Sequence, residues 1–385
     1  MNVIFTCGGT GGHINPAIAV ANILKERHPD CNILFIGGEG YMEEKLVPQA
    51  GYKLVVMPAY GLERSISVNS IRNNLQAMKS VLVSIKRCKK IIRDFQADVV
   101  VGTGGYASFP ALYAAKQLHI PTCVHEANAM PGLTTRMVAK WVDKLLVCFP
   151  ESAKHYRHPE KVEVVGMPVK REFIYKKKPD ARAELQMDSR PVVVSVYGSQ
   201  GAKAMNEMTA ELFLLEKKAG FPFRHIHAYG GFARDWMPAL VAEKGINLKE
   251  CPAITMQEYI YNMPTVMTAA DVIIGRAGAS SCSEIAASGT PCILIPSPNV
   301  TDNHQEKNAR ALEAQGAAIV IPETECTPQC LFDEITKLLT DKEVYTNMEK
   351  ALYSMAVPDS AERLCVALEK LAKKKEKNNA NQAEK

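Results

Sequence analysis

Four glycine-rich turns are the segments of this sequence best suited to chemistry, because each directly follows a short apolar run. They lie at residues 8–13 (GGTGGH), 102–106 (GTGGY), 198–202 (GSQGA) and 275–281 (GRAGASS). Glycine lets the backbone approach a ligand closely, and the helix that follows directs amide N–H groups toward it. One such turn is common in α/β folds. Four of them, two in each half of the chain, predict phosphate binding in a cleft between two domains.

The spacing within these turns argues against two common nucleotide-binding classes. None of the turns has the pattern Gly-x-x-x-x-Gly-Lys-Ser/Thr of P-loop enzymes. The first turn also lacks the pattern Gly-x-Gly-x-x-Gly and has His13 in place of the third glycine. The acid that could bind an NAD ribose would be Glu39, but it lies in a glycine-rich strand end. The sequence therefore does not favour NAD chemistry.

The elements that position these turns follow from short β-branched runs alternating with helix-length stretches. Apolar strands of this kind are typical of parallel sheets covered by helices on both faces, so we predict a doubly wound α/β fold. The predicted strands are at residues 3–5, 33–36, 99–101, 122–124, 145–147, 162–165, 192–196, 224–228, 272–274, 292–295 and 318–321. The unit of strand, glycine turn and helix restarts 190 residues into the chain, which predicts two Rossmann-like domains.

Composition narrows the class of protein further. The chain has 385 residues, 47% hydrophobic and 23% charged, which is ordinary for a globular protein. Its eleven cysteines are scattered without a Cys-x-x-Cys pair, which predicts reduced thiols and no metal site. The sequence has no apolar run of about 20 residues and no secretory signal, so we expect a soluble or peripheral protein kept in the cytosol.

One basic segment stands out from a chain with a net charge of only +5. Residues 64–93 hold eight Lys or Arg and no acid, which leaves the rest of the chain at −3 and argues against general nucleic-acid binding. Within 66–93, apolar residues recur every three or four positions beside a basic face. This pattern predicts a helix that docks on an anionic membrane surface. The alternative is an ordinary surface helix whose apolar stripe packs in the core.

Taken in order, the motifs resemble the MurG family of bacterial glycosyltransferases over nearly the whole chain. The segments that carry the resemblance are residues 8–13, 102–106, 125–128, 166–169, 198–202, 276–284 and 302–308. The resemblance implies an inverting transfer of N-acetylglucosamine from UDP-GlcNAc. The implied acceptor is the 4-hydroxyl of the muramyl residue in undecaprenyl-diphosphate-MurNAc-pentapeptide. This step belongs to peptidoglycan synthesis, and hence to cell shape and division, and it implies no cofactor and no metal.

The resemblance also implies the GT-B architecture, in which two Rossmann-like domains face each other across a cleft. Residues 1–166 would then form the acceptor and membrane-facing domain, and residues 167–350 the UDP-sugar domain. Residues 351–372 would form a helix that returns to the N-terminal domain, and the Lys/Asn/Glu-rich tail 373–385 is expected to be disordered. The protein is expected at the cytoplasmic face of the bacterial plasma membrane, with cell-wall synthesis proteins as possible partners.

For the donor, the resemblance assigns contacts residue by residue. Glu284 would accept both ribose hydroxyls, although a carboxylate there could also simply compensate the charge of a helix N-terminus. Ile260 would contact uracil through its backbone, and Gln305 the sugar hydroxyls. Lys170 or its neighbour Arg171 would hold the diphosphate, where relatives have an arginine. The remaining expected donor contacts are Thr10, Gly11, Gly12, Asn128, Ser199, Ala279, Ser280, Ser281, Cys282 and Ser283.

The reaction needs a base for the attacking hydroxyl, and His13 is the candidate. Its ordinary pKa of about 6.5 suits proton removal at neutral pH, but it could instead be a structural residue that closes the turn. Glu126 is the alternative base, and His125 a weaker one. The acceptor diphosphate is expected at Gly11, Gly12, Gly104, Gly105 and Tyr106.

Three other functions remain possible at this point. A UDP-GlcNAc 2-epimerase could share the fold, but a soluble substrate gives the basic helix no purpose. A non-enzymatic scaffold is disfavoured because His13, Glu284 and Gln305 are all present. A diacylglycerol-type lipid glycosyltransferase would explain the basic helix equally well.

Overall fold

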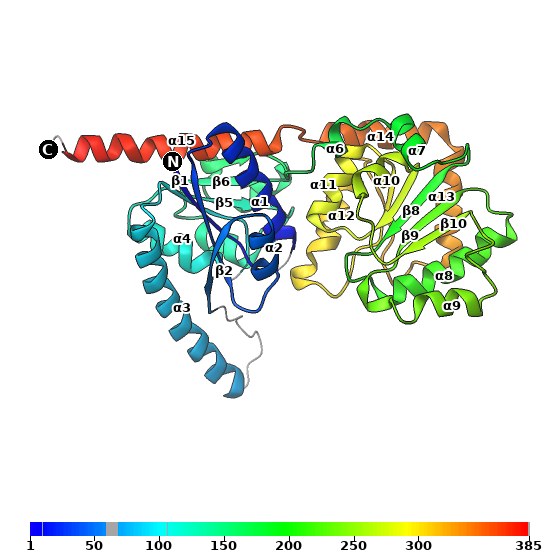
Figure 1. The fold of residues 1–385 in the computed structure, drawn as a ribbon, viewed down its shortest axis with the longest axis horizontal. Coiled ribbons are helices and arrows are strands. Elements are labelled where there is room, and N and C mark those ends of the chain that lie inside the picture. Colours follow the sequence, from blue (N-terminus) through cyan, green and yellow to red (C-terminus); the bar gives the residue numbers. More distant parts are fainter. Residues whose placement is uncertain (10, 59–67, 106, 384–385) are drawn as a thin grey trace. The chain divides into compact units, whose positions relative to one another are not determined.

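The chain forms two compact units in the computed structural model, which describes residues 1–9, 11–58, 68–105 and 107–383. The side chains of 68–79, 301 and 376–383 are outside this description. One unit comprises Met1–Pro168 together with Asp359–Lys385, and the other comprises Val169–Pro358 (Figure 1). We call them unit 1 and unit 2.

Unit 1 is built on a seven-stranded parallel sheet in the order β3-β2-β1-β4-β5-β6-β7. The strands are β1 (Asn2–Thr6), β2 (Asn32–Gly38), β3 (Lys53–Met57), β4 (Val99–Gly102), β5 (Thr122–Glu126), β6 (Lys144–Val147) and β7 (Val162–Val164). The helices are α1 (Gly11–Arg27), α2 (Glu43–Gln49), α3 (Val68–Asp94), α4 (Ser108–Gln117), α5 (Leu133–Val138) and α15 (Ser360–Ala383), with the 3-10 turns η1 (Pro150–His155) and η2 (Pro159–Lys161).

The last helix of the chain completes the core of unit 1. Its apolar face, which includes Leu364, Leu368 and Leu371, packs in one cluster with Phe5 of β1 and Leu24 of α1. Burying each leucine contributes about 1.5–3 kcal/mol, so α15 is part of the domain rather than an appendage. On the other face of the sheet, α3 and α4 cover a second cluster.

Unit 2 repeats the plan with a six-stranded parallel sheet in the order β10-β9-β8-β11-β12-β13. The strands are β8 (Val192–Val196), β9 (Arg224–Ala228), β10 (Ile254–Gln257), β11 (Val272–Gly275), β12 (Cys292–Leu294) and β13 (Ile319–Val320). The helices are α6 (Glu172–Tyr175), α7 (Lys178–Glu184), α8 (Lys203–Lys218), α9 (Met237–Glu243), α10 (Met263–Ala269), α11 (Ala279–Ser288), α12 (His304–Glu313), α13 (Pro328–Thr340) and α14 (Lys342–Met355), with the 3-10 turns η3 (Gly231–Ala233) and η4 (Thr301–Asn303). The predicted α/β class with parallel sheets is confirmed.

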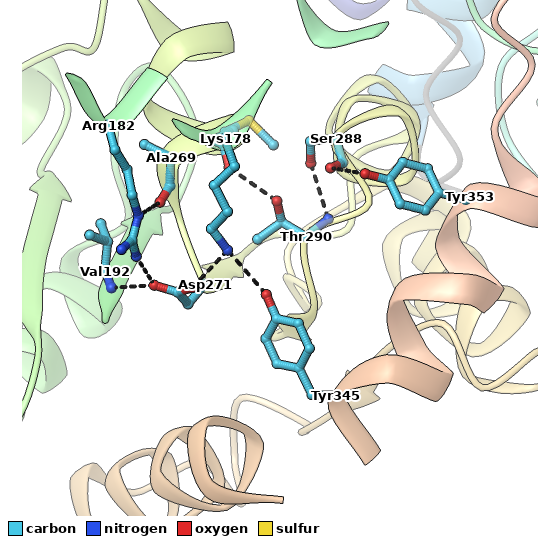
Figure 2. Close-up of polar contacts among 10 residues, drawn as sticks. Lys178, Arg182, Val192, Ala269, Asp271, Ser288, Thr290, Tyr345 and Tyr353 are labelled. Atoms are coloured by element: carbon cyan, nitrogen blue, oxygen red, sulfur yellow. Dashed lines mark hydrogen bonds and ion pairs between the residues drawn. The ribbon is translucent and has the colours of Figure 1, made fainter. Parts of the chain in front are cut away.

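An aspartate just before the fourth strand of each unit joins the amino ends of the two central strands. In unit 2, Asp271 accepts the Val192 N–H at 2.7 Å and pairs with Lys178 at 2.7 Å and with Arg182 (Figure 2). In unit 1, Asp98 accepts the Asn2 N–H at 2.8 Å and pairs with a lysine of α15 at 3.1 Å. The sequences around these aspartates, Ala-Asp-Val-Val and Ala-Asp-Val-Ile, are a further sign of the repeat.

The end of the chain differs from the sequence-based expectation. Helix α15 runs to Ala383, whereas a disordered tail was expected from Lys373. The reason is that Lys374 pairs with Asp143 at 3.2 Å and Lys375 with Asp98 at 3.1 Å, which holds this part of the helix on the amino ends of β6 and β4. Residues 351–355, expected in the returning helix, instead end α14 in unit 2.

The strand orders also fix where a ligand can bind. In each sheet the direction of winding reverses between the first and the fourth strand, β1 and β4 in unit 1 and β8 and β11 in unit 2. The loops at the carboxyl ends of these two strands diverge, and open α/β sheets bind their ligands there. All four glycine turns follow one of these four strands.

Candidate active site

His13 lies in the first turn of α1, against the glycine turn that follows β4. Its Nδ1 is 2.9 Å from the Thr103 carbonyl oxygen, and the Thr103 hydroxyl donates to the His13 carbonyl oxygen at 2.7 Å. A carbonyl only accepts, so Nδ1 carries the proton and the neutral ring has its lone pair on Nε2. This tautomer, inferred from the hydrogen bond, is the one a general base using Nε2 needs.

The glycines of the second turn are required because the first turn packs directly on them. A Cβ on Gly104 would lie 2.4 Å from His13 Nδ1, and one on Gly105 would lie 2.4 Å from the Gly8 carbonyl oxygen. Both glycines also have positive φ, +114° and +82°, which side chains rarely adopt. The structure thus brings Gly104 and Gly105 together with His13 at the switch point of unit 1.

Gly11 and Gly12 begin α1, so their amides belong to the helix N-terminus that has no partners within the helix. The predicted contacts Thr10 and Tyr106 lie outside the described residues.

Glu126 ends β5 and is buried, with both carboxylate oxygens accepting hydrogen bonds from its own loop. Oε1 accepts from the Asn128 backbone N–H at 3.0 Å and from Asn128 Nδ2 at 3.2 Å, and Oε2 accepts from the Gly132 N–H at 3.0 Å. Glu126 therefore shapes the loop that holds Asn128. Next to it, His125 is buried with Nε2 2.9 Å from the Gly166 carbonyl oxygen, and burial lowers the pKa of its imidazole. A neutral, enclosed His125 fits a structural role.

In unit 2, Ser199 is exposed on the glycine turn that follows β8. This turn packs against the turn after β9, because a Cβ on Gly201 would lie 2.0 Å from the Tyr229 carbonyl oxygen. Ile260 follows β10 and is almost fully buried, which leaves its backbone as the part that could meet a base. Its neighbours Tyr259 and Tyr261 are exposed, with ring centroids 4.9 Å apart.

Helix α11 presents its N-terminus at the switch point of unit 2. Gly278 caps it, so the amides of Ala279, Ser280 and Ser281 are first-turn donors without acceptors inside the helix. The side chains of two predicted donor residues, Ser283 and Cys282, are engaged within the protein. The Ser283 hydroxyl donates to the Ala279 carbonyl oxygen at 3.0 Å. The Cys282 side chain is buried, which raises the pKa of its thiol to about 12.

Glu284 lies one turn further along α11 and is half-buried. Burial raises the pKa of its carboxyl to about 7, and the charge of Lys170 acts in the opposite direction. Two predicted donor residues that lie more than a hundred positions apart are therefore close enough to interact electrostatically.

Gln305 and Asn308 attach α12 to the same end of the sheet. Gln305 Oε1 accepts from the Ser297 N–H at 2.9 Å, and Asn308 Nδ2 donates to the Ala277 carbonyl oxygen at 3.1 Å. Arg276 donates from Nη1 to the Ile295 carbonyl oxygen at 2.9 Å and pairs with Glu323. Sequence reasoning did not single out the positioning roles of Asn308 and Arg276, although both lie within the quoted motifs. Within the described part of the chain, no group of three or more His, Cys, Asp or Glu could hold a metal ion.

Comparisons with known proteins agree with this arrangement. Residues 3–147 match the glycosyltransferase family 28 N-terminal domain, and residues 192–364 match the family's C-terminal domain. A protein of Acetivibrio thermocellus is 39% identical over 97% of this chain and 99% of its own length. One of Lactococcus lactis subsp. cremoris is 38% identical over 94% of this chain and 98% of its own. Both are named UDP-N-acetylglucosamine–N-acetylmuramyl-(pentapeptide) pyrophosphoryl-undecaprenol N-acetylglucosamine transferase.

Solved structures give the same result. The crystal structure of Acinetobacter baumannii MurG superposes with a TM-score of 0.76 at 26% identity, over 96% of this chain and 99% of that one. A UDP-GlcNAc 2-epimerase from Neisseria meningitidis reaches 0.64 at 16% identity, over 96% of this chain and 100% of that one, and shows the shared fold alone. Two parallel α/β sheets with both domain matches define a glycosyltransferase of the GT-B architecture. The chain belongs to glycosyltransferase family 28 and, within it, to the MurG family, as the motifs predicted.

Proposed function

We propose that this protein transfers N-acetylglucosamine from UDP-GlcNAc to the 4-hydroxyl of the muramyl residue in undecaprenyl-diphosphate-MurNAc-pentapeptide. The observation that carries the proposal is the 39% identity with a transferase of that name over 97% of the chain. The family defines the chain as an enzyme, an N-acetylglucosaminyltransferase of peptidoglycan synthesis. Roles in cell shape and division, a place on the cytoplasmic face of the plasma membrane, and contacts with other cell-wall proteins are part of the proposal.

In this mechanism the acceptor oxygen attacks the anomeric carbon from the face opposite UDP. The bond from that carbon to the diphosphate breaks with its electron pair going to UDP, and His13 Nε2 takes the hydroxyl proton. His13 is preferred over Glu126 because the ordinary pKa of histidine, about 6.5, suits proton removal at neutral pH, whereas both Glu126 oxygens accept hydrogen bonds from its own loop. The charge that develops on UDP is met by the first-turn amides of α11 and by Ser199.

The other substrate contacts in the proposal are those that the family resemblance implies. In unit 2, Glu284 accepts the ribose hydroxyls, Ile260 meets uracil through its backbone, Gln305 reads the sugar, and Lys170 supports the diphosphate. In unit 1, the amides of Gly11, Gly12, Gly104 and Gly105 hold the acceptor diphosphate. Asn128, whose side-chain amide donates to Glu126, is proposed for a donor contact.

The direct test is incubation with radiolabelled UDP-GlcNAc and a muramyl-pentapeptide lipid analogue, with and without EDTA. Label should move to the lipid only when the muramyl acceptor is present. Conversion of UDP-GlcNAc into an epimer without acceptor would instead indicate a 2-epimerase. Transfer to diacylglycerol in preference to the muramyl lipid would indicate the other alternative.

The raised pKa of Glu284 predicts that UDP binding depends on pH. With a pKa of about 7 the carboxyl is neutral below pH 7, and the neutral acid is a weaker acceptor of hydroxyl hydrogen bonds than the carboxylate. Affinity for UDP should therefore fall as the pH is lowered from 8 to 6, approaching tenfold per unit below pH 7 if only the ionised form binds. The terminal phosphate of UDP also ionises in this range, so titration calorimetry should show a steeper slope in the wild type than in Glu284→Gln, and equal slopes in both would exclude a contribution from Glu284.

Helix α3 supports a membrane-docking surface in unit 1. Part of its apolar stripe, Ile85 and Ile92, packs in the core, whereas Leu82 and Val83 are 66% and 62% exposed. Lys86 is exposed one turn further on. Among the described residues no helix is both long and apolar enough to cross a bilayer. Apolar side chains beside basic ones on an exposed helix fit binding to an anionic lipid surface.

Replacing Lys79, Lys86 and Lys90 together by glutamate should remove most binding to anionic vesicles, measured by co-sedimentation. Each basic side chain near such a surface contributes about 1 kcal/mol, and this attraction fades beyond a Debye length of about 8–10 Å. Transfer to a short-chain soluble acceptor should survive, while transfer to long-chain lipid in vesicles should drop.

The control is Lys218, Lys249 and Lys342 replaced by glutamate, an equal charge change at exposed positions of unit 2. Unchanged vesicle binding by the α3 variant would refute the docking surface. Equal loss on both acceptors would show that the segment is part of the fold or of the acceptor site instead.

A further inference from the structure

A buried carboxylate that the mechanism does not use lies beneath the first glycine turn. Glu43 begins α2, and its side chain is 0% exposed. Its Oε2 accepts the Gly9 N–H at 3.1 Å, and its Oε1 accepts the Gly38 N–H at 2.8 Å. Gly9 follows β1 and Gly38 ends β2, so one carboxylate joins the carboxyl ends of two paired strands.

The glycines around Glu43 are shaped to admit it. A Cβ on Gly37 would lie 2.5 Å from Glu43 Cγ, and one on Gly8 would lie 3.1 Å from Glu43 Oε1. The glycine-rich end of β2 is thereby explained as space for this side chain. Glu43 also acts on Cys7. Burial, and to a smaller extent the negative charge of Glu43, raise the pKa of the Cys7 thiol to about 12.

The contacts continue from Glu43 to the proposed base. Gly9, whose N–H donates to Glu43, belongs to the turn that leads to His13, and the carbonyl oxygen of the preceding Gly8 is the atom against which Gly105 packs. Gly104 packs against the imidazole itself. A shift of the first turn must therefore move the surface against which the second turn and the His13 imidazole pack.

The same contacts decide which backbone N–H groups of the first turn are available to a substrate. The Gly9 N–H is already occupied by a carboxylate of the protein, so it is not a donor for an incoming phosphate. Among the described residues of this turn, the amides at the N-terminus of α1, from Gly11 onward, have no acceptor within the helix and can donate to an anion.

We propose that Glu43 is a positioning residue for transfer, whose buried carboxylate fixes the first glycine turn and thereby places His13 and the amides of α1 for the acceptor. This inference rests on the proposed transferase function. A buried ion that is hydrogen-bonded on both oxygens costs more to disturb than a surface charge, because removing a partner leaves polar groups unsatisfied.

The main test is Glu43→Gln, with Glu44→Gln as the matched control. Glu44 is the next residue and also accepts a glycine N–H, from Gly40 at 2.7 Å, but it is exposed. Glutamine has one accepting oxygen, so in Glu43→Gln one of the two glycine N–H groups faces an NH₂ group instead. We expect a 10- to 100-fold lower kcat with the donor KM within twofold of the wild type, and Glu44→Gln within twofold in both.

Hydrogen exchange without substrates gives the readout that separates this role from the transferase function. In Glu43→Gln, amides of peptides covering 6–14 and 36–42 should exchange at least tenfold faster, while those covering 275–290 in unit 2 stay unchanged. If the wild type transfers no sugar, the exchange result still decides whether Glu43 fixes the turn.

A second variant guards against a simple folding defect. Gly37→Ala keeps the carboxylate but puts a methyl group 2.5 Å from Glu43 Cγ, so it should reproduce the kcat loss in part and the faster exchange of 6–14. A lower melting temperature with unchanged kcat per folded molecule in both variants would overturn the proposal. So would unchanged exchange of the turn in Glu43→Gln.

Discussion

Replacing His13 by alanine is expected to lower kcat by on the order of 10²–10⁴, the usual contribution of a general base, while the affinity for UDP-GlcNAc stays near that of the wild type. The reason is that a base acts as the acceptor hydroxyl loses its proton, whereas the proposed contacts to ribose, uracil and the sugar hydroxyls, Glu284, Ile260 and Gln305, lie in unit 2. Initial rates at saturating acceptor, together with calorimetric donor binding, measure both quantities. In the wild type, kcat/KM should also fall as His13 becomes protonated at low pH.

His158→Ala is the matched control, because His158 is an exposed histidine of unit 1 whose Nδ1 lies 3.1 Å from Oε1 of its near neighbour Glu160. Its rate should equal that of the wild type. A loss below tenfold in His13→Ala would make His13 a structural residue that links the two turns of unit 1. Glu126 would then become the leading candidate for the base.

Replacing Glu284 by alanine is expected to raise the KM for UDP-GlcNAc about tenfold to a hundredfold with a much smaller change in kcat. A charge-assisted contact to the ribose hydroxyls contributes about 1.5–3 kcal/mol to binding, and the contact is present in both the ground state and the transition state. Donor saturation curves at fixed acceptor concentration give both constants.

A ligand that lacks the two ribose hydroxyls tests this contact from the other side, as in a double-mutant cycle. Binding of 2′,3′-dideoxy-UDP should be weaker than that of UDP in the wild type, but the two should be nearly equal in Glu284→Ala. If the alanine variant still distinguishes the two ligands as strongly as the wild type, the ribose contact is made elsewhere and Glu284 serves α11 alone.

The sequence alone predicted the features that depend on local patterns. Short apolar runs located eleven of the thirteen strands in the described residues, all but β3 and β10, and the four turns lie at the switch points of both sheets. The turns were predictable because backbone that passes close to another group requires glycine, as at Gly104, and glycine is visible in the sequence.

What the sequence could not supply are the partners that lie far along the chain or in another element. The glycine pair at residues 37–38 is visible in the sequence, but only the structure shows that the Glu43 side chain occupies the space beside Gly37. The composition of the lysine-rich tail predicts disorder, and only the structure shows that Lys374 pairs with Asp143 and Lys375 with Asp98. Local composition holds no record of such pairings.

The way α15 completes the core of unit 1 constrains how the chain can be made. The ribosome releases residues 1–168 long before the leucines of α15 exist, and about 190 residues of unit 2 are synthesised in between. At about 5–20 residues per second this interval lasts on the order of 10–40 s. Throughout it the apolar side chains around Leu24 lack the leucines that cover them in the folded unit, so we expect the core of unit 1 to be completed only after unit 2 has been synthesised.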